Sequence, residues 1–247
     1  MIPVFINPGL KKFAKRFARY FGVELRRYDS ATSEAAQFMA MLSEHEINLI
    51  FDVGANTGQF GESLRGAGYG GRIVSFEPLS AAREQLLSAA RNDSLWAIAP
   101  RAAIGSEDGE IEINVSENSV SSSVLNMLDT HTSAAPGSAY VGSEKVPLWR
   151  LDTIAPDYLT SDSVLFIKID TQGYEDRVLQ GATALLTRAI GLQLELSLVP
   201  LYDGQRLYDE LISQLKELGF ELWGMFPAFI DPTSGRLLQV DATFFRR

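Results

Sequence analysis

The chain has 247 residues, a length that suits one α/β domain with a small extension. It contains no cysteine and two histidines, which excludes disulfides, thiolate zinc sites and a cysteine nucleophile and argues against a histidine-rich metal site. With 22 Lys and Arg residues against 31 Asp and Glu residues, the net charge is −9, and an acidic body of this kind repels nucleic acid.

The first 46 residues are predicted to form a helical extension ahead of a main domain at residues 47–247. Residues 1–27 hold seven of the basic residues and one of the acidic residues, which leaves 15 basic and 30 acidic residues in the remainder. Between Leu10 and Phe21 apolar residues recur at helical spacing, with Lys and Arg on the opposite face. This helix either contacts an anionic membrane or a lipid-linked substrate, or packs on the domain with a solvated basic face, which is the commoner arrangement.

From residue 47 onward strand-like and helix-like segments alternate, which predicts a parallel sheet covered by helices on both faces. The last two expected strands have no helix between them and should pair antiparallel. Residues 116–145 show no period and are predicted to form a long irregular loop. The expected strands are 47–53, 71–76, 95–99, 110–115, 164–169, 190–199, 220–226 and 238–245, and the expected helices are 31–46, 79–91, 174–188 and 207–218.

A glycine turn follows the first expected strand, in the sequence Asp52-Val53-Gly54-Ala55-Asn56-Thr57-Gly58. Such a turn, between a strand and a helix, presents backbone N–H groups to a ligand. Its spacing differs from the Gly-x-Gly-x-x-Gly of dinucleotide sites, and an acid at its head suits a ligand with an ammonium group and no phosphate, such as S-adenosyl-L-methionine. The turn therefore predicts a donor site made by Asp52, Gly54, Ala55, Asn56 and Gly58.

The ends of the next two strands extend this predicted site. Glu77, followed by Pro78, lies about 25 residues beyond Asp52, close to the interval at which an acid binds ribose hydroxyls in nucleotide sites. After the third strand, Ala103 lies in a run of small residues that would leave room beside an adenine ring. A loop chosen only for its small residues is the alternative interpretation of Ala103.

Polar residues also lie on the strand 164–169 and on its successor. Lys168 and Asp170 share one face of the first, because side chains alternate along a strand, and a lysine inside a central strand needs a partner such as Asp52. Glu195 lies on the polar face of the next strand. Asp170 or Glu195 is then the acceptor-binding carboxylate or general base, with Lys168 at the donor site; alternatively, Lys168 and Glu195 form a structural ion pair. His131, in the irregular loop, is the third candidate base, although a loop histidine is more often solvent-exposed and idle.

These motifs resemble the FkbM-type methyltransferases over about residues 47–200. The least common of them lies between Lys168 and Glu175. The matching segments are Ile50–Gly58, Phe76–Pro78, Ala103–Gly105 with Asp108-Gly109, Leu151-Asp152, Ile167–Glu175 and Val178–Ala182.

The resemblance implies a Rossmann-like class I methyltransferase fold, with a mostly parallel seven-stranded sheet and an antiparallel last strand. It implies methyl transfer from S-adenosyl-L-methionine, commonly to a hydroxyl of a sugar in a glycolipid, polysaccharide or glycosylated natural product. Asp52, Gly54, Asn56, Gly58 and Glu77 would then belong to the donor site, with Asp170 at the reaction centre. The family usually has a glutamate where this chain has Gln172, so a role that needs that charge, including metal binding, does not transfer on the resemblance.

Other functions remain open beside this one. The same fold could methylate a nitrogen or a protein side chain, or the chain could bind the donor without catalysis. An NAD-dependent reductase is disfavoured by the glycine spacing. No apolar run approaches the ~18–20 residues that span a bilayer, and the N-terminus lacks the regions of a signal peptide, so we expect a soluble cytoplasmic protein. From the residue composition and the acidic charge, we expect no bound metal and no nucleic-acid partner.

Overall fold

The computed structural model describes residues 8–246 and divides the chain into two units, Met1–Met41 and Leu42–Arg247. The first unit contains α1 (Pro8–Tyr20), which begins with proline at the first helical position, where the missing N–H has no partner to lose. The helix α2 (Glu34–Glu44) runs across the division between the units. The domain boundary expected after residue 46 stays a prediction. Within residues 8–246, no helix is long and apolar enough to cross a membrane.

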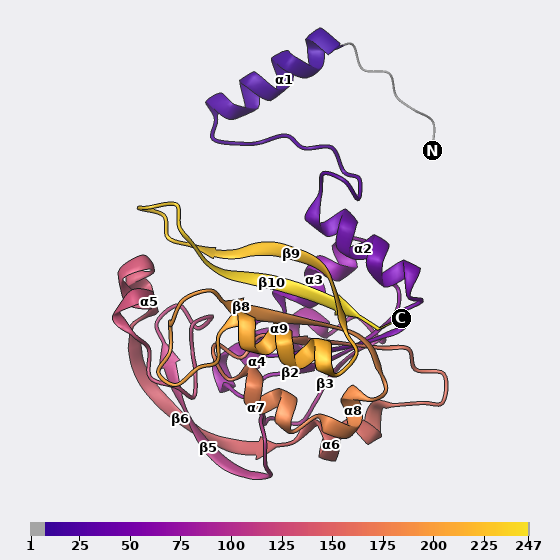
Figure 1. The fold of residues 1–247 in the computed structure, drawn as a ribbon, viewed down its shortest axis with the longest axis vertical. Coiled ribbons are helices and arrows are strands. Elements are labelled where there is room, and N and C mark those ends of the chain that lie inside the picture. The colour runs from indigo at the N-terminus through magenta and orange to yellow at the C-terminus, as the bar shows by residue number, and fades with distance from the viewer. Residues whose placement is uncertain (1–7, 247) are drawn as a thin grey trace. The chain divides into compact units, whose positions relative to one another are not determined.

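The second unit is built on a seven-stranded sheet with the order β3-β2-β1-β7-β8-β10-β9 (Figure 1). Strands β1, β2, β3, β7 and β8 pair in parallel, whereas β10 pairs antiparallel with both β8 and β9. The expected mostly parallel sheet with an antiparallel last strand is therefore confirmed. The strands are β1 (Leu49–Val53), β2 (Arg72–Phe76), β3 (Trp96–Ile98), β7 (Leu165–Ile169), β8 (Ala189–Ser197), β9 (Glu221–Ile230) and β10 (Leu237–Phe245).

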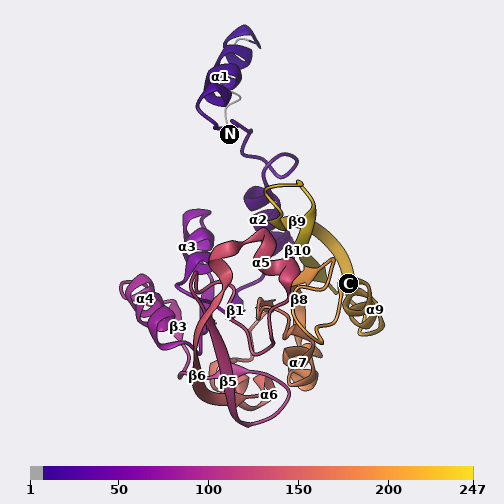
Figure 2. The ribbon, with the colours of Figure 1, turned by 90° about the vertical axis from the view of Figure 1, so that its left-hand side faces the viewer.

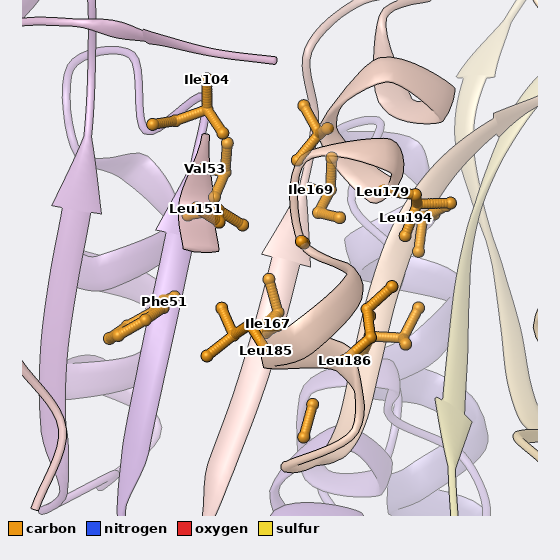
Figure 3. Close-up of a cluster of buried hydrophobic side chains, with 14 of the residues drawn as sticks. Phe51, Val53, Ile104, Leu151, Ile167, Ile169, Leu179, Leu185, Leu186 and Leu194 are labelled. Atoms are coloured by element: carbon orange, nitrogen blue, oxygen red, sulfur yellow. The ribbon is translucent and has the colours of Figure 1, made fainter. Parts of the chain in front are cut away.

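Helices lie on both sides of this sheet, with α3 on one side and α7 and α9 on the other (Figure 2). One sheet face is wholly apolar because alternate residues of each strand point to it, for example Phe51 and Val53 on β1. Figure 3 shows Leu151 and Leu179 packing on this face. The helices are α3 (Gln59–Gly66), α4 (Ser80–Ala90), α6 (Leu151–Ile154), α7 (Glu175–Gln180), α8 (Thr183–Leu186) and α9 (Tyr208–Glu217).

The opposite face carries a row of polar side chains across five neighbouring strands. Each member is paired in register with the next, and all are buried. The aromatic ring of Phe60 on α3 lies over the lysine of the row, with its centroid 5.3 Å from Nζ. The row consists of Ser75, Asp52, Lys168, Gln193 and Thr243.

The prediction of an irregular loop at residues 116–145 was wrong. This segment contains α5 (Asp129–Ala134), a short 3-10 turn, and the start of β6 (Tyr140–Trp149). Strand β6 pairs with β4 (Ala103–Ile104) and β5 (Gly109–Ser116) in a separate three-stranded sheet. Gly and Pro within β6 obscured its alternation, because both residues are depleted in strands.

The helix predicted at residues 174–188 is divided into α7 and α8. The division falls at Gly181 and Ala182, where the chain passes the end of β4. A Cβ at Gly181 would lie 1.9 Å from the carbonyl oxygen of Gly105, so only glycine permits this approach. Periodicity along the sequence cannot show a contact between two backbones so far apart in the chain.

Candidate active site

A cavity of about 320 Å³ lies at the carboxyl ends of the central strands, a size within the range of small-molecule sites. Open α/β sheets bind ligands at this edge, outside the ends of parallel strands. The lining comes mainly from the ends of β1, β2 and β7, the β4 region and residues 119–124, with further residues from α3, β5 and β10. Its members from the predicted site are Gly54, Ala55, Asn56, Glu77, Pro78, Ala103, Lys168 and Asp170.

The glycine turn brings the ends of β1 and β7 together. Gly54 has φ of 81° and donates from its backbone N–H to the carbonyl of Phe76 at 3.1 Å. A Cβ on Gly54 would lie 1.8 Å from the backbone oxygen of Asp170. Because glycine alone tolerates both the positive φ and this contact, the turn holds the Asp170 backbone against the donor-site loop.

Glu77 is buried at the cavity wall and organises the loop around it. Its Oε2 accepts from the Asn56 N–H and its Oε1 accepts from the Leu79 N–H, both at 2.8 Å. Burial raises the pKa of the Glu77 carboxyl to about 7, and these two N–H groups oppose the shift. Each carboxylate oxygen keeps a lone pair that a ligand hydroxyl could use.

Donor binding should therefore depend on pH. We expect the affinity for S-adenosylhomocysteine to rise through pH 7 and to fall by up to roughly tenfold per pH unit below it, because ionised Glu77 accepts ribose hydroxyls best. The raised pKa of Glu77 also affects the stability of the free protein. Between about pH 4.5 and pH 7 the folded state holds a proton on Glu77 that the unfolded state has lost, so the free energy of unfolding should decrease as pH rises through this range.

Titration calorimetry on either side of pH 7 measures this dependence. Glu77→Gln cannot ionise and should bind more weakly, with a flat pH profile. The exposed Glu84→Gln is the matched control and should keep the wild-type slope. A slope that survives in Glu77→Gln would show that another group causes it.

Two predicted donor-site residues lie behind the cavity wall and not in its lining. Asp52 is fully buried; its Oδ2 accepts from the Ser75 hydroxyl at 3.1 Å, and its Oδ1 lies 3.5 Å from Nζ of Lys168. Gly58, with φ of 100°, lies against Trp96, which a Cβ would meet at 3.2 Å. The expected pairing of Asp52 with Lys168 is thus present. Asp52 and Gly58 support the site from outside the cavity lining.

Lys168 links this buried wall to the reactive end of the cavity. Its Nζ donates to Oδ2 of Asp170 at 3.2 Å as well as facing Asp52. Burial alone would lower the pKa of the Lys168 ammonium, but the neighbouring carboxylates of Asp170, Asp52 and Asp241 outweigh burial and raise it. Lys168 therefore stays protonated and fixes one oxygen of Asp170.

The other oxygen of Asp170 is held by an amide. Gln172 donates from Nε2 to Oδ1 of Asp170 at 2.9 Å and to Oε2 of Glu195 at 2.6 Å. The Tyr202 hydroxyl donates to Oε1 of Gln172 at 2.7 Å, which fixes the orientation of the amide. A neutral double donor thus separates two carboxylates that would otherwise repel each other.

Glu195 lies one side chain behind Asp170 and is not among the residues that line the cavity. Its Oε2 also accepts from Nε2 of Gln239 at 2.7 Å. Burial, followed by the charges of Asp170 and Asp241, raises the pKa of Glu195 well above its ordinary value. The alternative of a Lys168–Glu195 ion pair is replaced here by pairing of Lys168 with Asp52 and Asp170.

Replacing Gln172 with Glu tests whether activity depends on a neutral side chain between Asp170 and Glu195. The change places a third carboxylate between Asp170 and Glu195. In a plot of kcat against pH, we therefore expect the fall in activity on the acidic side, the acidic limb, to shift to higher pH by at least about one unit. Activity against pH is the measurement. Tyr202→Phe, which removes the supporting hydroxyl without changing charge, should lower activity while leaving the limb in place. An unmoved limb in Gln172→Glu would contradict this account.

His131 does not reach the cavity, contrary to its prediction as a base in a lid. The ring is buried between those of Tyr202 and Phe229, with centroids 5.2 Å from each, and its Nε2 lies 3.2 Å from the Ser121 hydroxyl. Burial lowers the pKa of His131 to about 4. The histidine is therefore a neutral packing residue.

Several cavity residues were missed by the sequence analysis. Asp241 on β10 lies opposite Glu195 in register, and the polar alternation of Gln239, Asp241 and Thr243 was a signal that could have found it. The segment 119–124 had no such signal, because it is positioned by contacts distant in the chain: Ser123 forms a bridge with Asn114 of β5, and its hydroxyl donates to the carbonyl of Gln172. The other missed residues include Gln59, Phe60, Ser119, Val120, Ser122, Ser123, Thr171 and Tyr174.

Comparison with known proteins gives one family match. A family model described as the methyltransferase FkbM domain matches residues 52–222. None of the curated proteins matches the chain.

Among solved structures, the chain is similar to TehB from Haemophilus influenzae, with 9% identity, a TM-score of 0.46 and coverage of 85% of this chain and 62% of that one. It is also similar to magnesium protoporphyrin IX methyltransferase from Synechocystis with bound S-adenosylmethionine, with 12% identity, a TM-score of 0.43 and coverage of 100% and 86%. A TehB-like methyltransferase from Corynebacterium glutamicum shows 12% identity, a TM-score of 0.41 and coverage of 98% and 100%.

Proposed function

Because the chain belongs to the FkbM-domain family of methyltransferases, which use S-adenosyl-L-methionine, we propose that it methylates a hydroxyl oxygen, with Asp170 as the base. The acceptor in this proposal is a sugar of a glycolipid, polysaccharide or glycosylated natural product. The observation that carries the proposal is the Asp170 carboxylate. It lines the cavity beside the glycine turn, and Lys168 and Gln172 hold its two oxygens.

The donor site fits S-adenosyl-L-methionine on three observations. Gly54 lines the cavity at the β1 turn, where its positive φ and its close approach to the Asp170 backbone allow only glycine. Glu77 offers ribose hydroxyls two carboxylate oxygens at the end of β2. Ala103 and Ile104 provide an apolar wall for an adenine ring. When bound, the donor supplies an electrophilic methyl group on a sulfonium.

Asp170 performs the proton transfer in the proposed reaction. It accepts the acceptor's hydroxyl proton as the new oxygen–carbon bond forms and the carbon–sulfur bond breaks, and it later releases the proton to solvent. The departing thioether is neutral, so no acid is needed. General base catalysis typically contributes ~10²–10⁴-fold, and alignment of the oxygen with the methyl carbon can lower the barrier by ~7–11 kcal/mol.

Transfer of radiolabelled methyl into a fractionated extract of the source organism tests this function. We expect label in a glycolipid, polysaccharide or small-metabolite fraction, in a linkage that survives mild alkali as a methyl ether does. Asp170→Asn protein, shown to bind S-adenosylhomocysteine, is the matched control and should transfer label at least about a hundredfold more slowly.

Other outcomes separate the rival functions. Label in protein, or in an alkali-labile ester, would overturn hydroxyl methylation while leaving the methyltransferase family intact. Binding without transfer to any fraction would favour the non-catalytic alternative. A cytoplasmic location is part of the proposal, because a chain without cysteine needs no oxidising compartment for disulfide formation.

A further inference from the structure

The first unit carries a surface that the proposed methyl transfer does not use. α1 contains five Lys and Arg residues and no Asp or Glu. Aromatic residues recur every four positions at Phe13, Phe17 and Phe21, and their exposed fractions are 67%, 58% and 64%. Successive rings contact each other, with centroids 6.2 Å and 5.1 Å apart. The basic residues of α1 are Lys11, Lys12, Lys15, Arg16 and Arg19.

The rings and the cations lie on opposite sides of the helix. Residues four apart share one face, so Phe13 and Phe17 form a single stripe that Phe21 continues. Lys12 and Arg16 lie four residues apart and Arg16 and Arg19 three apart, so these cations are grouped on the other side. A helix with this division can engage an apolar phase and a negatively charged layer at the same time.

An anionic lipid bilayer presents those two environments in the required arrangement. Aromatic rings enter the boundary between headgroups and acyl chains, while Lys and Arg remain at the level of the phosphates. A nucleic acid fits less well, because stacking on bases and pairing with phosphates would need rings and cations on one face. We propose that α1 binds peripherally to anionic bilayers, lying in the plane of the interface with Phe13 and Phe17 buried in lipid.

The acidic remainder of the chain does not prevent this binding. Residues 28–247 hold 15 basic and 30 acidic residues, so the attraction must come from the N-terminal segment. The segment 21–33 between α1 and α2 could extend to ~45 Å, whereas charges are screened over ~8 Å at physiological salt. The inference is independent of the proposed function, because neither donor nor acceptor takes part in it.

Co-sedimentation of the full chain with vesicles tests the proposal without measuring activity. Vesicles of phosphatidylcholine mixed with phosphatidylglycerol should bind the protein, and vesicles of phosphatidylcholine alone should bind it at least about tenfold more weakly. Replacing Lys12, Lys15 and Arg16 together with Gln should weaken binding to the anionic vesicles by roughly 10- to 100-fold. Replacing Phe13 and Phe17 with Ser should weaken it at least about tenfold.

A matched variant controls for net charge. Arg188, Lys216 and Arg236 are exposed in the second unit, and their combined replacement with Gln removes the same charge without touching α1, so binding should not change. Binding of S-adenosylhomocysteine shows that each variant is folded. Failure to sediment with either vesicle, or equal loss in this control, would overturn the proposal. Two other results would overturn it. The protein could bind RNA equally well after Phe13 and Phe17 are replaced, or hydrogen exchange in the presence of vesicles could show α1 protected by the second unit and not by lipid.

Discussion

Asp170→Asn should reduce turnover by ~10²–10⁴-fold and leave donor binding near the wild-type value. The substitution removes the carboxylate that lines the cavity but keeps its shape, and Lys168 retains Asp52 as a partner. Because a base acts on the reaction and not on the bound donor, kcat and kcat/KM should fall together. Single-turnover methyl transfer and calorimetry with S-adenosylhomocysteine measure the two quantities.

Comparison of Asp170→Asn with Glu195→Gln shows which of the two carboxylates acts as the base. Glu195 was the second candidate base, yet it lies behind Asp170 and outside the cavity lining. Gln keeps one acceptor oxygen for the Gln172 and Gln239 amides, so this variant should retain much more activity than Asp170→Asn. If Asp170→Asn kept activity within about tenfold of wild type while Glu195→Gln lost it, the two roles would have to be exchanged.

Gly54→Ala should abolish donor binding and destabilise the second unit. The added Cβ would lie 1.8 Å from the Asp170 backbone oxygen, and the residue has φ of 81°. Left-handed strain and overpacking together cost about 2–5 kcal/mol, which is a large share of the stability of a typical domain. Denaturant unfolding measures the stability loss, and calorimetry measures donor binding.

Substitutions at two other glycines distinguish the cost of backbone strain from the cost of the steric clash with Asp170. Gly68 has φ of 95° with open space around it, so Gly68→Ala carries the backbone strain alone. Gly66, at the end of α3, has neither positive φ nor a neighbour within 4 Å, and Gly66→Ala should leave stability within about 0.5 kcal/mol of wild type. If Gly54→Ala lost no more stability than Gly68→Ala and still bound the donor, the close approach of Gly54 to the Asp170 backbone would not be required for donor binding.

Much of the fold followed from the sequence because its signals are local. Buried parallel strands such as β1 and β7 are short apolar runs, and the glycine turn after β1 has a definite spacing, so both were placed correctly. The resemblance to FkbM-type methyltransferases is confirmed by the family match over residues 52–222. The sheet formed by β4, β5 and β6 was not predicted, because its pairings join segments distant in the chain.

The site was less predictable than the fold, since distance from the cavity is a tertiary property. Asp52 and Asp170 both follow the polar alternation of their strands, yet one is fully buried and the other faces the cavity. His131 has the chemistry of a base, but α5 turns it into an aromatic cluster. Gln172 gave no sign in the sequence that it would contact both Asp170 and Glu195.

The polar row across the sheet also bears on how the strands find their partners during folding. A slip of one residue in β7 would turn Lys168 toward the apolar face and bring Ile167 or Ile169 among carboxylates. A buried charge separated from its partners typically costs several kcal/mol, so misaligned sheets are strongly disfavoured. Charges that add little to net stability can therefore select one alignment of the strands, and with it the position of Asp170, over every competing one.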